Sequence, residues 1–292
     1  MRLVTVAGAY GEAPGGVVRA DGGIAGLAHW GWPTVEHLIR AGPAAWSVVE
    51  REANLVPASW PAGQRLRSPL TSPPRNLMCA GLNYAAHVAE GGRDASQRGP
   101  APVIFTKPWT TLIGPEDDLV IDPAVTREAD WEAELAVVIG VGGRDITEDE
   151  AMRHVFGYCL ANDVSARDLQ RASGPGAQWD KGKSLDGFCP LGPELVTGAS
   201  MPDLAELRIT LSVNGAAKQD FRPADMTWSV PELIVYLSAG MALLPGDIIL
   251  TGTASGVGLW RDPQEFLADG DVIEISCAGL GRLRNRVTQR HG

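Results

Sequence analysis

The sequence has few of the features that mark membrane, secreted or nucleic-acid-binding proteins. No apolar run approaches the roughly 18 residues that a membrane-spanning helix needs, and the opening MRLVTVAGAYGEAPGG has no long apolar segment typical of a signal peptide. Lys and Arg number 25 against 35 Asp and Glu, a formal net charge of −10. An acidic chain is poorly suited to phosphate backbones and anionic lipids. We therefore expect a cytoplasmic protein with no nucleic acid and no membrane as partner.

Several familiar catalytic and binding motifs are also missing. The chain has no GxSxG, which argues against a serine hydrolase. The glycines of VIGVGGRD lack the GxGxxG spacing of dinucleotide sites, and those of LTGTASGVG lack the GK[ST] of a P-loop. The four cysteines, Cys79, Cys159, Cys189 and Cys277, lie far apart and form no CxxC. We expect isolated, buried thiols.

What the sequence does contain is a series of short apolar runs divided by turns. The chain has 292 residues, of which 45% are hydrophobic, 35 are Gly and 21 are Pro. LMCAGL, AELAVVIGV, VFGYCLAND, LRITLSVNG and GDIILTG have the length and composition of strands. Beyond residue 77, only residues 84–91, 147–154 and 229–239 favour helices. Many strands with few helices predict an α+β, β-rich fold of barrel or roll type rather than a doubly wound sheet.

A proline-rich segment divides the chain into two expected parts. RSPLTSPPRNL, residues 67–77, holds three prolines and is typical of a rigid extended connector. Before it, LVTVAGA and GGVVRADGG predict a short β-meander, TVEHLIRAG predicts a helix ending at Gly42, and VVEREANLVP another stopped by Pro57. We predict a small N-terminal domain over residues 1–70 and a catalytic domain over residues 71–292.

The strongest local signal is a set of acidic residues beside apolar strands. Glu132 and Glu134 stand at the start of the expected strand AELAVVIGV, and residues two apart in a strand face the same side. Asp163 directly follows another apolar run, FGYCLAN. Three carboxylates without a nearby His or Cys suit a hard cation, namely Mg²⁺, Mn²⁺ or Ca²⁺. The spacing of the two glutamates alone favours a solvated strand edge over a metal site, because two glutamates at this spacing are common; Asp163 is what favours the metal site.

A histidine and a glutamate three residues apart form a candidate acid–base pair. In GLNYAAHVAEGG, His87 and Glu90 would share one face of a short helix. A carboxylate beside an imidazole fixes its tautomer and raises its basicity, which suits a general base. A plain surface pair is the alternative. The glycine-rich segment that follows, residues 90–102, suits either a lid over a site or an ordinary surface loop.

Cationic and polar residues near these segments complete the candidate site. Lys183 lies between Gly182 and Ser184, where its charge would offset the carboxylates and stabilise an enolate or carboxylate oxygen. Arg167 and Gln170 follow Asp163 by four and seven residues, a spacing that places them on one face of a helix. Together they would bind a carboxylate. For each of them, an ordinary solvated residue is the alternative.

Taken together, these segments resemble the fumarylacetoacetate hydrolase superfamily. The resemblance covers roughly residues 70–290 and rests on GLNYAAHVAE, PVIFTKP, DWEAELAVVIG, GYCLANDVSARDLQ, KGKSLDGFCPLGP and LPGDIILTGTASGVG, in that order. It implies a mixed β-roll with a small N-terminal domain, usually a homodimer, and a Mg²⁺-like ion. The roles that it implies are metal binding for Glu132, Glu134 and Asp163, catalysis for His87, Glu90 and Lys183, and substrate binding for Arg167, Gln170, Thr253 and Lys107.

The resemblance is to the shorter branch of the superfamily. Ala80 stands where the fumarylacetoacetate hydrolases proper have a fourth metal ligand. The resemblance implies, first, metal-dependent hydrolytic C–C cleavage of an acylpyruvate-like 2-oxo or 1,3-dicarbonyl acid through an enolate. Decarboxylation of an oxaloacetate-type acid, or isomerisation, on the same site is the alternative. A metal-binding protein without catalysis is the third.

Overall fold

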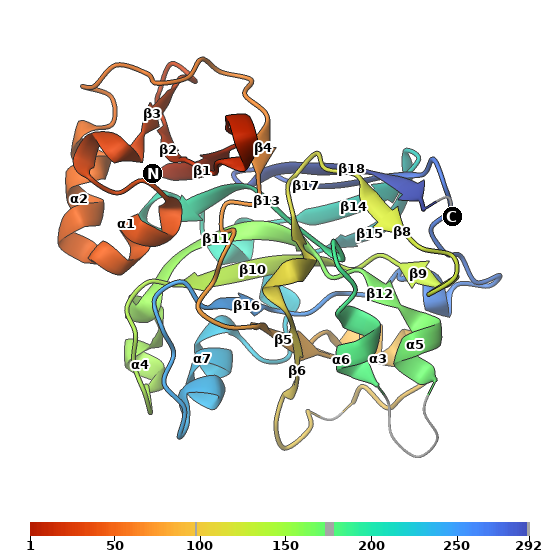
Figure 1. Cartoon of the computed structure of the whole chain (residues 1–292). Coiled ribbons are helices and arrows are strands. Elements are labelled where there is room, and N and C mark those ends of the chain that lie inside the picture. Colours follow the sequence, from red (N-terminus) through yellow and green to blue (C-terminus); the bar gives the residue numbers. More distant parts are fainter. Residues whose placement is uncertain (97, 173–177, 291–292) are drawn as a thin grey trace.

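The fold is built on one large, mostly antiparallel sheet. The computed structural model describes residues 1–96, 98–172 and 178–290 (Figure 1). The sheet has 11 strands, of which nine follow one another side by side. In spatial order these nine are β3 (Ile24–Gly26), β2 (Gly15–Val18), β1 (Arg2–Val6), β13 (Cys189–Thr197), β11 (Val155–Asn162), β10 (Ala133–Ile139), β16 (Ile248–Leu250), β5 (Leu77–Gly81) and β6 (Val103–Lys107). At the sides, β4 (Leu66–Arg67) pairs with β1 and β7 (Leu112–Ile113) pairs with β13.

A second sheet of five strands packs near the large one. Its order is β15 (Ala216–Phe221), β14 (Ile209–Val213), β17 (Val272–Cys277), β18 (Gly281–Gln289) and β8 (Leu119–Ile121). A two-stranded ladder joins β9 (Ala129–Asp130) to β12 (Ser165–Ala166). The helices are short: α1 (Val35–Ala41), α2 (Pro43–Glu52), α3 (Ala85–Glu90), α4 (Glu148–Ala151), α5 (Arg167–Arg171), α6 (Trp179–Lys183) and α7 (Val230–Ser238). The predicted α+β, β-rich class is confirmed.

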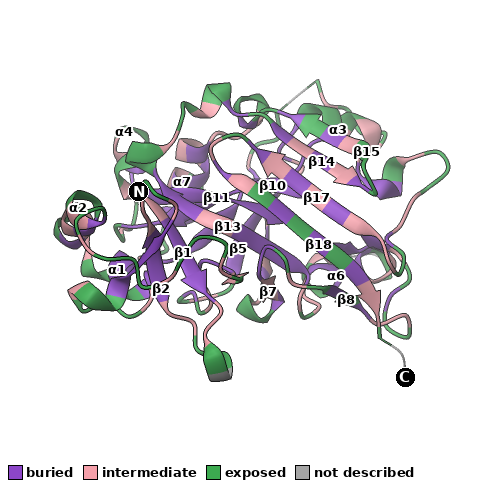
Figure 2. Ribbon diagram, turned by 90° about the horizontal axis from the view of Figure 1, so that it is seen from above, coloured by how far each residue is buried: buried purple, intermediate pink, exposed green. Residues whose placement is uncertain are grey.

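Strand β10 lies in the middle of the large sheet and is buried along its whole length. In Figure 2, strands β17 and β18 of the second sheet lie in front of it. Its alternate side chains enter two different cores. Leu135 and Val137 pack in a cluster that includes the second sheet, whereas Ala136 and Val138 pack in a cluster that includes α1 and α2. A strand covered on both faces requires an uninterrupted apolar sequence, which explains the run AELAVVI.

The N-terminal segment joins this sheet. Strand β1 pairs antiparallel with β13, with Arg2 opposite Val196 and Leu3 opposite Leu195. The expected meander is present as β1, β2 and β3, and α1 ends before Gly42, which has a φ of 85°. The second helix, α2, begins at Pro43, a favoured first position, and ends at Glu52, earlier than expected. The division into domains at residue 70 stays a prediction.

The other expected helices are present at the predicted places. α3 and α7 match closely, and α4 is followed by a single 3₁₀ turn. α7 starts with a capping box in which Ser229 and Glu232 satisfy each other's backbone groups. All four cysteines are buried and unpaired. Among the described residues, no helix is long and apolar enough to span a membrane.

Helices α5 and α6 approach each other so closely that a glycine is needed between them. A Cβ on Gly182 would lie 2.7 Å from the Cα and 2.8 Å from the backbone N of Gln170. Backbone atoms cannot give way as a flexible side chain can. The contact fixes the position of Lys183, the next residue of α6.

We predict that Gly182→Ala destabilises the protein by about 1–3 kcal/mol, the usual cost of overpacking, because α6 must move away from α5. The matched control is Gly198→Ala, where a Cβ meets nothing within 4 Å. The control should change the free energy of unfolding by less than about 0.5 kcal/mol. Urea denaturation of both variants measures the difference, and equal stabilities would contradict the packing argument.

Candidate active site

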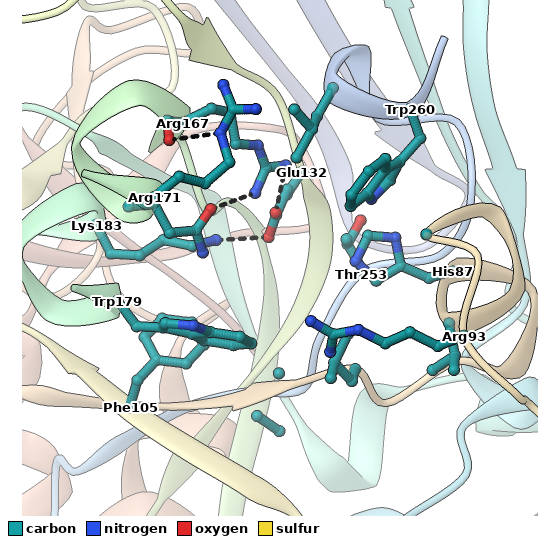
Figure 3. A pocket seen from close by; sticks show the side chains of 17 residues that line it. His87, Arg93, Phe105, Glu132, Arg167, Arg171, Trp179, Lys183, Thr253 and Trp260 are labelled. Carbon is teal, nitrogen blue, oxygen red and sulfur yellow. Dashed lines mark hydrogen bonds and ion pairs between the residues drawn. The ribbon is translucent and has the colours of Figure 1, made fainter. Parts of the chain in front are cut away.

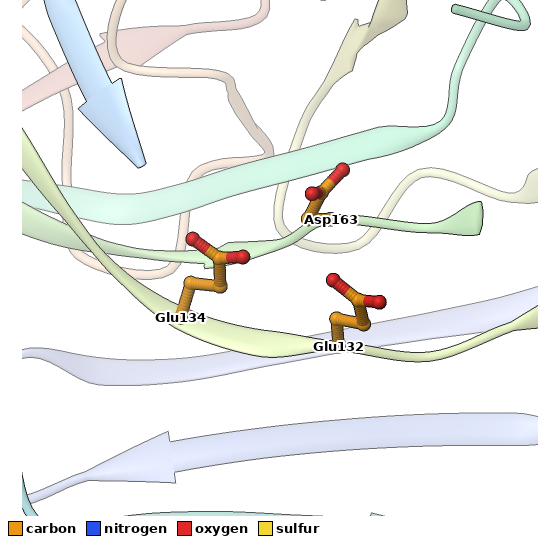
Figure 4. A group of neighbouring side chains, drawn as sticks. All are labelled: Glu132, Glu134 and Asp163. Carbon is orange, nitrogen blue, oxygen red and sulfur yellow. The ribbon is translucent and has the colours of Figure 1, made fainter. Parts of the chain in front are cut away.

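The pairing of β10 with β11 brings the three predicted metal-binding acids together. Ala133 lies opposite Asn162 in this ladder, so the residues just beyond the pair, Glu132 and Asp163, are also neighbours. The Asp163 N–H donates to the Glu132 carbonyl at 2.9 Å. Glu134 faces the same side as Glu132, as expected two residues along a strand. One carboxylate oxygen from each lies within 4.8 Å of the others, and Figure 4 shows Glu132 and Glu134 extending from the same side of one strand, beside Asp163.

Two buried lysines bind the acidic cluster. Lys183 Nζ, from the end of α6, lies 2.7 Å from Glu132 Oε2 and 2.7 Å from Asp163 Oδ2. Lys107 Nζ, from the end of β6, lies 2.8 Å from Asp163 Oδ1 and donates to the carbonyls of Val164 and Lys183. Both lysines are almost completely inaccessible to solvent. Pairing of this kind is what makes buried charge tolerable.

Arg167 connects the cluster to a fourth buried acid. Its Nη2 lies 2.7 Å from Glu132 Oε1, and its Nε lies 2.8 Å from Asp130 Oδ2. Its Nη1 donates to Gln170 Oε1 at 3.0 Å, as the helical spacing of the two residues in α5 allows. Asp130 also accepts the backbone N–H groups of Gly258 and Leu259. The guanidinium is thus held on three sides.

The two glutamates of the cluster have opposite protonation tendencies. Burial favours the neutral form of both. For Glu132 the attraction of Lys183 and Arg167 outweighs burial and lowers the pKa to about 2. For Glu134 burial raises the pKa well above its usual value, and repulsion from Asp163 and Glu132 raises it further. Its one backbone partner, the Gly252 N–H at 2.7 Å, does not offset this.

These residues fit a divalent cation. Oxygen ligands without His or Cys suit Mg²⁺, Mn²⁺ or Ca²⁺. Glu134 lacks a cationic side-chain partner among the described residues, and its pKa is raised by burial first and by repulsion from Asp163 and Glu132 second. A bound cation would stabilise its ionised form. The acidic cluster therefore has the donor set and the electrostatic demand of a metal site.

His87 and Glu90 form the expected pair on α3. His87 Nδ1 lies 2.7 Å from Glu90 Oε1, and Glu90 Oε2 accepts the Gly256 N–H at 2.7 Å. Both oxygens of Glu90 are therefore engaged. A carboxylate on Nδ1 favours the tautomer with its proton there, which leaves the Nε2 lone pair as a base. His87 is 8% exposed and lines the cavity described next.

A cavity of about 200 Å³ lies beside the acidic cluster (Figure 3). His87 faces it from one side and Lys183 and Glu132 from the other, with Trp179, Phe105 and Trp260 as apolar walls. The volume is below the roughly 300–1,000 Å³ typical of drug-sized ligands, so the cavity suits a molecule of a few carbon atoms. Its lining comprises Ala80, Gly81, Leu82, His87, Val88, Gly91, Arg93, Phe105, Glu132, Arg167, Gln170, Arg171, Trp179, Lys183, Thr253, Leu259 and Trp260.

Three of the four predicted substrate-binding residues line the cavity, and the fourth does not. Arg167, Gln170 and Thr253 line the cavity. Thr253 Oγ1 donates to the Ala133 carbonyl at 2.8 Å and accepts from Gln219. Lys107 does not line the cavity, and its Nζ contacts Asp163, which does not line the cavity either. Its geometry corresponds to holding Asp163 rather than to contact with a substrate.

Sequence reasoning missed several members of the site. Asp130 is fully buried on Arg167, and its place two residues before Glu132 continues the same alternation. That pattern was a usable signal. Arg93 and the walls Trp179 and Trp260 had none, because each enters the cavity from a segment whose position depends on the fold.

Known proteins are similar to this chain over most of its length. Residues 76–288 match the family model described as fumarylacetoacetate (FAA) hydrolase C-terminal. The chain is 41% identical over 255 residues to the bovine (Bos taurus) protein named oxaloacetate tautomerase FAHD2A, mitochondrial, covering 87% of this chain and 79% of that one. It is 43% identical over 223 residues to the Bacillus subtilis oxaloacetate tautomerase YisK, covering 76% and 73%.

Solved structures give the same picture. A fumarylacetoacetate hydrolase from Exiguobacterium antarcticum superposes with a TM-score of 0.83 at 35% identity, covering 99% of this chain and 100% of that one. A maleylpyruvate hydrolase from Sphingobium sp. SYK-6, in complex with manganese(II) ion and pyruvate, superposes with a TM-score of 0.78 at 30% identity and covers both chains fully.

The raised pKa of Glu134 leads to a prediction for Glu134→Gln. The amide keeps the shape and can still accept from Gly252, but it cannot carry the negative charge. Without metal the variant should unfold at the same or a higher temperature than the wild type. The rise in Tm on adding Mn²⁺ or Mg²⁺ should be largely lost, where a saturated site adds about 2.7 kcal/mol at one hundred times its Kd.

The control for this measurement is Asp220→Asn, an acid paired with Arg208 in the second sheet. It should keep the full cation-dependent rise in Tm. A Glu134→Gln variant that responds to the cation as the wild type does would contradict the assignment of the cluster as a metal site.

Proposed function

The chain belongs to the fumarylacetoacetate hydrolase family, and we propose that it catalyses keto–enol tautomerisation of a small 2-oxo dicarboxylic acid of the oxaloacetate type. The observation that carries the proposal is the position of the His87–Glu90 pair, which faces Lys183 and Glu132 across one small cavity. A base and a cation on opposite sides of a substrate are what proton transfer next to a carbonyl requires.

The relatives support tautomerisation better than the hydrolysis expected first from the sequence. Both relatives described above, at 41% and 43% identity, are named oxaloacetate tautomerases. The first expectation ranked hydrolytic cleavage above decarboxylation and isomerisation, although the same residues serve all three reactions. We now place isomerisation first and hydrolysis second.

His87 removes the proton from carbon and returns it to oxygen. In the keto form, the reacting carbon is the CH2 carbon between the carbonyl and the distal carboxylate. One of its C–H bonds breaks, and the proton goes to Nε2 of His87. The electron pair moves to form the C=C bond, and the carbonyl π electrons move to oxygen. Return of the proton to that oxygen gives the enol, so atoms and charge balance. Glu90 stabilises the imidazolium that forms, because its carboxylate accepts a hydrogen bond from the Nδ1–H group throughout the reaction.

The carbonyl oxygen that gains negative charge in this step needs a positive charge beside it. Lys183 is buried beside the cavity, where its charge is felt more strongly than in water. A divalent ion held by Glu132, Glu134 and Asp163 would supply Lewis-acid polarisation of the 2-oxo group. Arg167 keeps Glu132 ionised and in place through its 2.7 Å contact.

Three lining residues are suited to hold the substrate's 1-carboxylate and its neighbouring oxygen. The Gln170 side-chain oxygen accepts from Arg167, and its amide nitrogen, which donates to none of the described residues, is suited to donate at the cavity wall. Thr253 and Arg167 lie on the same cavity surface. Fixing the substrate in this way aligns the C–H bond with the base, a contribution of orientation rather than of charge.

Hydrolytic C–C cleavage is the second candidate. It is favoured by the likeness to the maleylpyruvate hydrolase that holds manganese and pyruvate. The same His87 can take a proton from water, which then attacks a second carbonyl. Such a reaction needs a substrate with two suitably placed carbonyls, so the products identify it.

Further features of the expected enzyme belong to the proposal. Mg²⁺ or Mn²⁺ is the proposed ion, supported by the oxygen donor set and by the manganese of the hydrolase structure. A homodimer and a cytoplasmic location are likewise proposed. Sedimentation analysis tests the first and fractionation of the native host tests the second.

The deciding experiment follows the enol of oxaloacetate by ultraviolet absorbance, with Mn²⁺-loaded protein and with chelator. Faster interconversion without loss of carbon supports tautomerisation. Pyruvate and CO₂ would assign a decarboxylase. Pyruvate and a second carboxylic acid from acetylpyruvate or fumarylpyruvate would assign the hydrolase. No effect on any of the three would sink the proposed function.

We predict that His87→Gln lowers kcat for tautomerisation by about 10²–10⁴-fold, the usual contribution of a general base, while the cation-dependent rise in Tm persists. The control is His29→Gln, which changes an exposed histidine of the N-terminal segment and should leave kcat unchanged. An undiminished kcat in His87→Gln would remove this residue from the mechanism.

A further inference from the structure

The segment that follows α3 carries an arginine into the cavity. Gly92, with a φ of 71°, turns the chain, and the Arg93 N–H donates to the Val88 carbonyl at 3.2 Å. Gly91 lies against the ring of Trp260, where a Cβ would sit 3.4 Å from ring atoms. Figure 3 shows the Arg93 side chain reaching into the cavity from the side of His87.

The same segment is anchored on its far side. Arg98 lies 3.4 Å from the centroid of the Trp228 ring and 2.7 Å from Glu232 on α7. A cation over an indole face, joined to an ion pair, is a specific contact rather than a loose surface one. The turn at Gly92 and this anchor together set where Arg93 stands.

Arg93 differs from the other cations of the cavity in its partners. Lys183 is bound to Glu132 and Asp163, Arg167 to Asp130 and Glu132, and Arg171 to Glu128. Among residues 1–96, 98–172 and 178–290, Arg93 makes no ion pair with a carboxylate. Its guanidinium is the cavity cation whose charge no described side chain neutralises.

We infer that Arg93 binds the distal carboxylate of the substrate and so selects dicarboxylic over monocarboxylic 2-oxo acids. This inference rests on the proposed function, because it takes the acidic cluster as the end that receives the 2-oxo group. The opposite end of a short substrate then lies among Trp179, Trp260 and Phe105. A carboxylate between apolar walls needs a cation, and an arginine offers it two parallel N–H donors.

The size of the cavity supports this reading of substrate length. About 200 Å³ accommodates a molecule of a few carbons. Lys183 and Arg93 both line this cavity, so a four-carbon diacid in it would have one end beside Lys183 and the other beside Arg93. A methyl group in place of the distal carboxylate would keep the length but leave Arg93 without a partner, which is the difference that a selective site exploits.

The kinetic test compares Arg93→Gln with the wild type on two substrates of equal length. Oxaloacetate carries the distal carboxylate, and 2-oxobutanoate has a methyl group there. The rate with oxaloacetate is measured from the enol absorbance and the rate with 2-oxobutanoate from C3 hydrogen–deuterium exchange by NMR. We expect kcat/KM for oxaloacetate to fall about 10–100-fold, mainly through KM. The rate for 2-oxobutanoate should stay within about two-fold.

Two further variants sharpen the result. Arg93→Lys keeps the charge but not the two-pronged geometry and should recover part of the loss. Arg171→Gln removes a cavity cation that is already paired and should affect both substrates alike. A loss specific to oxaloacetate in Arg171→Gln but not in Arg93→Gln would overturn the inference.

A binding measurement separates this inference from the proposed function. With Mn²⁺-loaded protein, calorimetry compares malate with 2-hydroxybutanoate, an unreactive pair that again differs only in the distal carboxylate. The wild type should prefer malate, and Arg93→Gln should lose that preference. If the wild type fails to tautomerise oxaloacetate but Arg93 still sets the preference, the reaction is wrong and the subsite stands. A different result would contradict the subsite alone. If the wild type turns over oxaloacetate, but Arg93→Gln still prefers oxaloacetate to 2-oxobutanoate in turnover and malate to 2-hydroxybutanoate in binding, the subsite is wrong and the reaction stands.

Discussion

The central constraint on this structure is the burial of four carboxylates within one small region. Asp130, Glu132, Glu134 and Asp163 are all at most 5% exposed. An unpaired buried charge costs several kcal/mol, so each must have a partner. Lys107, Lys183 and Arg167 provide three, and they come from β6, α6 and α5. The need to pair these charges therefore constrains where β6 and α6 end and where α5 begins.

The count of charges explains why the two glutamates of the cluster differ. Four carboxylates face three cations, which leaves one negative charge in excess. Glu132 contacts two of the cations and stays ionised at low pH, whereas Glu134 has only a backbone N–H as partner. Burial raises the pKa of Glu134, and repulsion from Asp163 and Glu132 raises it further, so proton uptake at Glu134 would restore neutrality. A bound divalent ion would instead remove the negative excess without a proton and, with all four acids ionised, leave the region with one positive charge.

Local patterns in the sequence predicted the elements and many contacts, but not the reaction. The alternation of Glu132 and Glu134, the spacing of His87 and Glu90, and the turn after Asp163 each depend on neighbours in the chain, and the structure brings these residues together. Arg93, Trp179 and Trp260 enter the site from segments far apart in sequence, so no local spacing predicts them. Hydrolysis and tautomerisation both need a base, an enolate stabiliser and a small cavity. The residues alone could not rank them, and the relatives did.

The commitment of most cations to internal partners also bears on how an anionic substrate is attracted. A chain with a formal net charge of −10 repels anions in general. Lys183, Arg167 and Arg171 line the cavity, but the carboxylates they contact cancel much of their field beyond a few ångströms. Attraction must then come from charge that is not cancelled. Arg93 offers such charge at the end beside His87, and a divalent ion held by Glu132, Glu134 and Asp163 would offer it at the other. Two such separated positive centres would match two carboxylates at the ends of a short chain. In the proposed reaction they would hold the CH2 group between those carboxylates in the space that His87 faces.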